Sequence, residues 1–352
     1  MSVTSEATAL PGIGPRVTRS RRNVWWTGVV ALAVVVVFFL LPYIVQPGTT
    51  AILDQAFVIL TLACMWNLLA GYGGLVSVGQ QAFLGLGAYF VLIAAIHGIS
   101  PFLGLPLAAI GSGVAALPLW WLVSRLRTGY FAIGTWVLAT AVALFVEQFQ
   151  SIGGGTGAPM PGLDSYGSVL LSAYTYWAGL VVTLLALAAV YFLLRSRVGL
   201  MLTAIRDDET AARSSGVRVG FARMLVFVIA AVGCGGAGAV LAIQQLQVVP
   251  QTSGGVFSVQ WTAEMAFAVI IGGIGTIEGP IIGTIIYMVL QQTLQQYNVW
   301  YLISLGLVAI AITLFARRGL WGLVDEHLGI RLFPVGYYLW PAGQSRRGKR
   351  AV

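Results

Sequence analysis

Apolar residues occur in long runs along this chain, separated by short polar or glycine-rich segments. A helix of about 20 residues crosses the hydrocarbon core of a membrane, so runs of this length predict transmembrane helices. The shortest run, 262–274, is interpreted as a short or half-spanning helix. The predicted fold class is all-α, a polytopic helical membrane protein. We expect about ten spans, at 26–45, 51–70, 80–97, 101–124, 129–148, 169–194, 224–247, 262–274, 281–296 and 299–316.

Composition narrows the possible functions. The 352 residues are 58% hydrophobic and 9% charged, whereas soluble domains are roughly 25% charged. A large soluble catalytic or nucleotide-binding domain is therefore excluded. The only lysine, Lys349, lies in the C-terminal tail, so the chain has no phosphate-binding loop of the Gly-x4-Gly-Lys type. The two histidines show no zinc-site spacing, and Cys64 and Cys234 lie inside apolar runs, where we expect buried packing.

Arginines indicate the orientation of the spans. Four of them precede the first run, which is too long and ends too abruptly at Gln46-Pro47-Gly48 to be a signal peptide. The positive-inside rule then places the N-terminus, the loops 125–127 and 195–222, and the tail in the cytoplasm. The net charge of +8 is attributed to this orientation rather than to nucleic acid. The expected regions are an N-terminal extension (1–25), a transmembrane domain (26–316) and a basic cytoplasmic tail (317–352).

Two glycine-rich segments, 71–79 and 272–280, interrupt the apolar runs at comparable places in the two halves of the chain. Paired interruptions of this kind indicate a transport path, because broken backbone in a membrane must be buried or line a cavity. Close helix packing is the alternative, since small residues let membrane helices approach one another. The candidate path residues are Gly73, Gly74, Ser77, Gly79, Gly272, Gly273, Gly275, Glu278 and Gly279.

Acidic residues near the spans are further candidates, because charge inside a membrane is costly and usually functional. Glu278 is the strongest, although it could instead cap the glycine-rich turn. The other four fall toward the external side, Asp164 in the longest external loop, and for the remaining three an interfacial position without function is an equal alternative. These four acids are Asp54, Glu147, Asp164 and Glu264.

The long cytoplasmic loop contains a polar segment, 206–216, that we interpret as one short surface helix. Asp207, Asp208 and Glu209 suit the first turn of a helix, where they complement its dipole, and Gly216 suits the stop. A solvated connector is the alternative. The whole chain has only eleven acidic residues, and three of them are consecutive here. This concentration favours a contact surface that faces the compartment holding ATP.

Taken together, these residues resemble the membrane permeases of branched-chain amino acid ABC importers, of the M-subunit kind. The similarity runs from Trp66 to Gln292 and is specific only as a set of motifs. It departs from the family at Gln80-Gln81, where a histidine-containing stretch is common. The matching pieces are 71–89, 130–133, 153–157, 199–216, 235–239 and 272–283.

The resemblance implies a bacterial inner-membrane importer with a second permease subunit, two cytoplasmic ATPases and an external solute-binding protein. It also implies that Glu209, Ala212 and Gly216 belong to a coupling helix that seats in the ATPase. ATP and magnesium would then bind the partner subunits, and this chain would bind no cofactor and would not be an enzyme. Similar permeases serve importers of urea, short amides and other amino acids, so the solute stays open. A self-contained secondary carrier and a membrane enzyme are the weaker alternatives.

Overall fold

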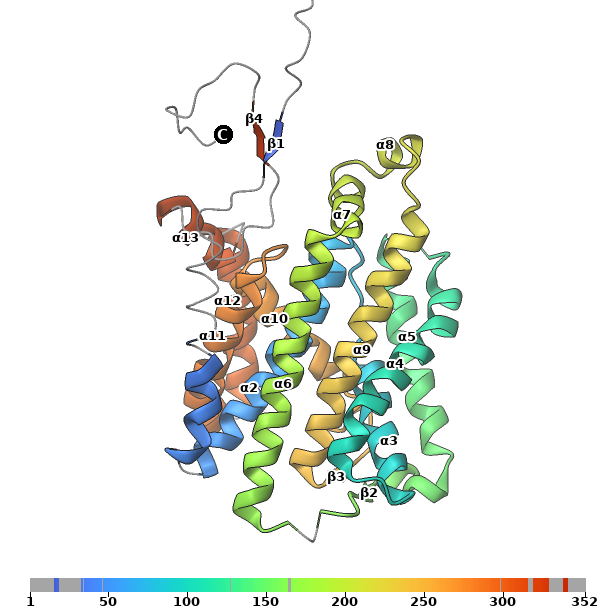
Figure 1. Cartoon of the computed structure of the whole chain (residues 1–352), viewed down its shortest axis with the longest axis vertical. Helices are drawn as coiled ribbons and strands as arrows, with labels where there is room; N and C mark the ends of the chain where they lie inside the picture. Colours follow the sequence, from blue (N-terminus) through green and yellow to red (C-terminus); the bar gives the residue numbers. More distant parts are fainter. Residues whose placement is uncertain are drawn as a thin grey trace, which may run out of the picture.

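The apolar runs fold into a bundle of helices (Figure 1). This computed structural model describes residues 16–18, 33, 35–45, 47–126, 128–163, 166–297, 299–315, 319–328 and 338–340. The all-α class expected from the sequence is confirmed. The helices are α2 (Pro47–Asn67), α3 (Gln81–Ile96), α4 (Pro101–Val123), α5 (Thr128–Glu147), α6 (Ser168–Arg195), α7 (Arg197–Asp207), α8 (Glu209–Ser214), α9 (Val219–Gln245), α10 (Val259–Gly272), α11 (Glu278–Leu294), α12 (Val299–Phe315) and α13 (Gly319–Leu328).

Each predicted run from 51–70 onward corresponds to one helix, with ends that agree within about five residues. Of the run 26–45, residues 33 and 35–40 are helical, followed by a 3-10 turn at Leu41–Tyr43. By length and composition, α3 and α10 are too short to count as full spans, so the number ten stays a prediction. Among the residues that the structure describes, six stretches are long and apolar enough to cross a membrane: Gly48–Tyr72, Pro101–Val123, Gly129–Glu147, Ser168–Arg195, Val219–Gln245 and Ile303–Leu323.

The core of the bundle lies where α9 crosses α3. Adding a Cβ to Gly87 of α3 would place it 2.0 Å from the carbonyl oxygen of Gly235, and a Cβ on Gly238 of α9 would lie 1.9 Å from that of Leu84. The two backbones are therefore in direct contact, as small residues permit in membrane helices. By contrast, large apolar side chains on α4, α5 and α12 are exposed, as lipid contact requires.

Figure 1 places α7 and α8 at one end of the bundle, and strands β2 (Ala158–Pro159) and β3 (Gln247–Val248) at the other. The segment that carries α7 and α8, from the end of α6 to the start of α9, is rich in arginine, whereas the sequences 148–167 and 246–258 around the strands contain neither lysine nor arginine. By the positive-inside rule, the arginine-rich end is expected to face the cytoplasm. The arginines of this end include Arg195, Arg206, Arg213, Arg218 and Arg223.

Parts of both terminal extensions are also ordered. Strand β1 (Arg16–Thr18) pairs antiparallel with β4 (Tyr338–Trp340), Val17 lying opposite Leu339. Within the predicted basic tail, α13 packs against α10, α11 and α12, and its Trp321 is buried. The start of the tail therefore packs on the helical bundle. The basic composition of the tail gave no indication of this packing.

Candidate functional site

The first glycine-rich break separates α2 from α3. Helix α2 continues as a π-helix, Leu68–Tyr72, and the chain is then non-helical until Gln80. Side chains bond the backbone of this break: the Trp66 Nε1–H donates to the Ser77 carbonyl oxygen at 2.9 Å, and the Val78 N–H donates to the Thr135 Oγ1 at 3.2 Å. Non-helical backbone inside a membrane needs such partners. The break is therefore a built feature of the fold.

The candidate residues of the first break have different roles. Gly74 has a φ of +65° with open space around it, so its backbone conformation favours glycine. Gly79 instead lies against α5, because a Cβ there would be 2.1 Å from the Thr135 carbonyl oxygen. Ser77 is buried, and its hydroxyl accepts from the Gly79 N–H at 3.2 Å. A Cβ on Gly73 would also lie close to backbone, 2.7 Å from the Leu69 carbonyl oxygen.

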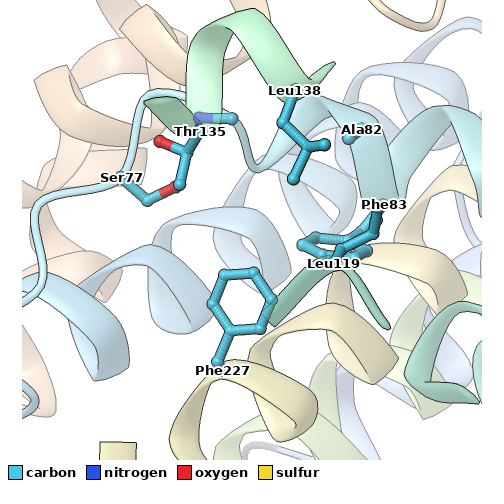
Figure 2. Close-up of a pocket in the computed structure, with 8 residues that line it drawn as sticks. Ser77, Ala82, Phe83, Leu119, Thr135, Leu138 and Phe227 are labelled. Atoms are coloured by element: carbon cyan, nitrogen blue, oxygen red, sulfur yellow. Dashed lines mark hydrogen bonds between the residues drawn. The ribbon is translucent and has the colours of Figure 1, made fainter. Parts of the chain in front are cut away.

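A small cavity adjoins this break (Figure 2). Ser77 and Thr135 form its polar side, and both hydroxyls already bond the backbone of the break or of α5. It has room for about one water molecule. An amino acid does not fit this cavity in the conformation described. The lining residues are Ser77, Gly79, Ala82, Phe83, Leu119, Thr135, Leu138 and Phe227.

Gln80 and Gln81, where the sequence departs from the family pattern, are both buried at the start of α3. The Gln80 Oε1 accepts from the Cys234 thiol of α9 at 3.3 Å, and the Gln81 Oε1 accepts from the Thr262 hydroxyl of α10. The two glutamines thus fix the first break to helices of the second half. Cys64 and Cys234 are both free and buried, as expected.

The second break is a tight turn between the antiparallel helices α10 and α11. A Cβ on Gly272 would lie 1.8 Å from the Gly279 carbonyl oxygen, so the helices touch through their glycines. Gly273 has a φ of +132°, and its N–H donates to the Val269 carbonyl oxygen at 2.8 Å. The Gly279 N–H donates to the Thr276 Oγ1 at 3.0 Å. The backbone amides of Gly273 and Gly279 are thus bonded within the turn.

The end of α2 contacts this second break directly. The Asn67 Oδ1 accepts from the Gly275 N–H at 2.8 Å, and the Asn67 Nδ2 donates to the Thr276 carbonyl oxygen at 2.7 Å. Glu278, the first residue of α11, is buried. Sequence reasoning selected Glu278 but missed Asn67, whose only signal was an amide inside an apolar run.

The structure does not gather all the predicted path residues at one cavity. Gly79 lies against α5 and Ser77 lines the small cavity with Thr135, whereas Gly272 and Gly279 contact each other across α10 and α11. Of the other acids, Asp54 is buried in α2 and Glu264 is partly buried in α10, while Glu147 ends α5. Asp164 lies outside the described residues. A path role for the glycines stays a prediction.

The predicted coupling segment consists of two helices rather than one. Asp208 interrupts the helix because its Oδ1 accepts from the Thr210 and Ala211 N–H groups at 2.8 and 3.0 Å, which caps α8. Asp207 is therefore the last residue of α7 and does not lie in the first turn of α8. This corrects the interpretation of 206–216 as one helix. The predicted stop is confirmed, since Gly216 follows α8 with a φ of +82°.

Glu209 holds α8 against α9. Its carboxylate accepts from Arg213 at 2.7 Å and from Arg223 at 2.9 Å. The hydrogen bond from Arg213, followed by that from Arg223, lowers the pKa of Glu209 although partial burial opposes the shift. Within α8, the Ala212 side chain is buried, while Thr210, Ala211 and Ser214 are exposed. The segment thus presents small and hydroxyl side chains on a face anchored by ion pairs.

Among the described residues, no three His, Cys, Asp or Glu side chains form a group that could hold a metal ion. The expectation that this chain binds no cofactor stays a prediction.

Comparison with known proteins identifies the family. The family model described as "Branched-chain amino acid transport system / permease component" matches residues 48–315. The chain is 25% identical to the high-affinity branched-chain amino acid transport system permease protein LivM of Salmonella typhimurium, over 85% of this chain and 76% of the relative. It is 26% identical to LivM of Escherichia coli, over 86% and 76%. No solved structure matches. The chain belongs to the family of permease components of branched-chain amino acid transport systems, as a multi-pass inner-membrane protein.

Proposed function

We propose that this chain is one permease subunit of an ATP-driven importer that moves branched-chain amino acids or related small polar solutes into the cytoplasm. It pairs with a second, different permease subunit and receives solute from an external binding protein. Two cytoplasmic ATPase subunits bind ATP and magnesium and hydrolyse the ATP. Membership of a permease family supports the transport role.

The observation that carries this proposal is the α7–α8 segment. It projects from the arginine-rich end of the bundle (Figure 1), and a cap, a buried alanine and two ion pairs fix its conformation. A solvated connector needs none of these contacts. We infer that the segment is a docking surface for an ATPase, with Asp207 and Asp208 at its entry, Glu209 and Ala212 holding it, and Gly216 ending it.

We further propose that both glycine-rich breaks border the translocation path. Their tight contacts and positive φ angles let the chain turn inside the membrane domain. Broken backbone at this depth must be buried or line a cavity, and paired breaks in two halves of a transporter are typical of a transport path. The first break contributes Gly73, Gly74, Ser77 and Gly79. The second contributes Gly272, Gly273, Gly275 and Gly279, with Glu278 orienting it.

A tryptophan on the exposed face of α8 tests the docking proposal. Ala211 is exposed, so Ala211→Trp blocks seating in a groove without breaking any contact that holds α8. The matched control is Gly129→Trp, because Gly129 at the start of α5 is also exposed and has open space around it. We expect Ala211→Trp to abolish leucine uptake and co-purification of the ATPase, and Gly129→Trp to preserve both. Uptake that survives Ala211→Trp would reduce α8 to a connector.

Replacing Glu209 and Gly216 together should also abolish uptake while subunit abundance stays normal. Those changes also remove the ion pairs and the left-handed stop of α8, so Ala211→Trp is the sharper test. Absence of any co-purifying ATPase in the unmodified protein would favour a self-contained carrier.

A further inference from the structure

Asn67 connects the two halves of the chain through a pair of hydrogen bonds. It is the last residue of α2 and is 1% exposed. Its single amide group accepts from the Gly275 N–H at 2.8 Å and donates to the Thr276 carbonyl oxygen at 2.7 Å. A side-chain amide is suited to this geometry because it carries a donor and an acceptor side by side. The second break is thereby fixed to α2 at two adjacent backbone groups.

Glycines make this contact possible. A Cβ on Gly71, one helical turn after Asn67, would lie 2.4 Å from the Asn67 Oδ1 and 2.6 Å from the Gly275 nitrogen. Gly275 itself has a φ of +79°, which orients its N–H toward the asparagine at little steric cost. The close approach thus depends on Asn67, Gly71 and Gly275 together.

The segment that carries the proposed docking surface contacts the same turn. Arg206 lies in the last turn of α7, and its Nη1 is 3.3 Å from the position that a Cβ on Gly275 would occupy. Only Asp207 and Asp208 separate Arg206 from α8. Displacement of α8 therefore reaches Arg206 through two residues of chain, and Arg206 lies against the second break.

We propose that Asn67 is a positioning residue that holds the second break against α2, and that Arg206 transmits movement of the α7–α8 segment to this break. The proposal rests on the proposed function as an ATP-driven permease. In this coupling mechanism, movements of the ATPase reach the membrane domain through Arg206. Asn67 then makes the end of α2 move with the second break. Loss of either contact uncouples ATP hydrolysis from transport without unfolding the subunit.

The test uses the complete transporter reconstituted in lipid vesicles, with leucine uptake and ATP hydrolysis measured in the same preparation. Asn67→Leu keeps the branched shape and the number of heavy atoms of the side chain but removes both hydrogen bonds. Because two partly buried backbone groups lose their partners, we expect the ratio of leucine uptake to ATP hydrolysed to fall about tenfold or more. Asn67→Asp keeps the acceptor for Gly275 but loses the donor to Thr276, so its ratio should be intermediate.

Arg206 is tested in the same assay. Arg206→Met keeps the apolar stem and removes the guanidinium, and should lower uptake per ATP, whereas Arg206→Lys should restore part of it. Arg218→Met is the matched control, because Arg218 is also an exposed arginine at this end of the bundle but lies after Gly216, where the docking segment ends, and precedes α9. We expect this control to keep the ratio of the unmodified transporter.

The outcomes separate the two proposals. If the unmodified complex couples uptake to ATP hydrolysis and Asn67→Leu keeps the same ratio, the positioning role of Asn67 is overturned. A parallel loss of uptake and hydrolysis in Asn67→Leu assigns it a structural role only, which overturns the proposal as well. An unmodified complex that takes up leucine without any use of ATP would overturn the proposed function, and the coupling role with it.

Discussion

Replacing Gly272 by alanine is expected to force α10 and α11 apart. Gly272 is the last residue of α10 and is buried. A Cβ there would lie 1.8 Å from the Gly279 carbonyl oxygen, whereas ordinary van der Waals contact begins at 3.4 Å. The obstructing atom is backbone, so no side-chain rotation relieves the overlap. One helix must move by more than an ångström, and the turn that Asn67 holds must move with it.

The magnitude follows from the kind of atom that obstructs the new methyl group. Overpacking a core lowers the free energy of unfolding by about 1–3 kcal/mol, occasionally more. Because the obstructing atom is backbone, we expect Gly272→Ala to lower it by about 3 kcal/mol. The control is Gly306→Ala in α12, because Gly306 has no atom within 4 Å of the Cβ position. That change should be neutral or stabilise by up to about 1 kcal/mol through helix propensity.

The assay is thermal unfolding of the detergent-solubilised protein together with leucine uptake in cells. Gly272→Ala should lower the unfolding midpoint and the uptake, and Gly306→Ala should lower neither. Equal unfolding midpoints for the two variants would refute the close packing of α10 against α11. Normal stability with lost uptake would instead show that Gly272 acts in transport independently of packing.

Three further predictions concern the arginine-rich end. Asp208→Ala should speed hydrogen exchange of the α8 amides, since an N-cap contributes about 1 kcal/mol. Asp208→Asn should keep the protection, and equal exchange in the unmodified protein and both variants would contradict the cap. The pKa of Glu209 is lowered from its ordinary 4.5, so the carboxylate stabilises the folded α8 above that pH, and this stabilisation is lost as the pH falls through the lowered pKa. A nitroxide at Ser214 should therefore gain mobility only in acid, whereas Glu209→Gln should give high mobility at neutral pH too; an unchanged spectrum in Glu209→Gln would contradict the anchoring role. Labelling from the cytoplasmic side is expected for cysteines introduced at Ser20, Ser214 and Ser345, and external labelling at Ser345 would remove one of the ten predicted spans.

The helices were predictable because long apolar runs have one common solution in a membrane, and their ends fall near the polar residues that bound them. The coupling segment was predicted less well, because two opposed effects act on Asp208. An acid favours the start of a helix through the dipole, but as a cap it ends the preceding one. The structure shows the second effect: the Asp208 side chain accepts from the α8 backbone, and α7 stops at Asp207.

The positions of the glycine-rich breaks were also visible in the sequence, but the reason for each glycine was not. Gly74 satisfies a backbone angle in open space, whereas Gly79 satisfies a contact with α5. Local sequence does not separate these cases, because the contacting atom belongs to a residue such as Thr135, far along the chain. Asn67 was missed for the same reason, since its partners Gly275 and Thr276 belong to the other half.

Valine at Gly275 separates backbone strain from contact at the second break. Gly275 has a φ of +79° and lies where a Cβ would be 3.3 Å from the Arg206 Nη1 and 3.4 Å from the Gly71 carbonyl oxygen. Gly98, two residues after the C-terminal end of α3, has a φ of +80°, and no atom lies within 4 Å of its Cβ position. Gly98→Val therefore carries the same left-handed strain of about 1–2 kcal/mol without the contacts. Gly275→Val should block leucine uptake while the ATPase still assembles, because the branched side chain displaces Arg206 or separates the break from α2. Gly98→Val should transport at a near-normal rate. If both variants transport equally well, the contacts of Gly275 are dispensable, and the second break is not part of the transport path.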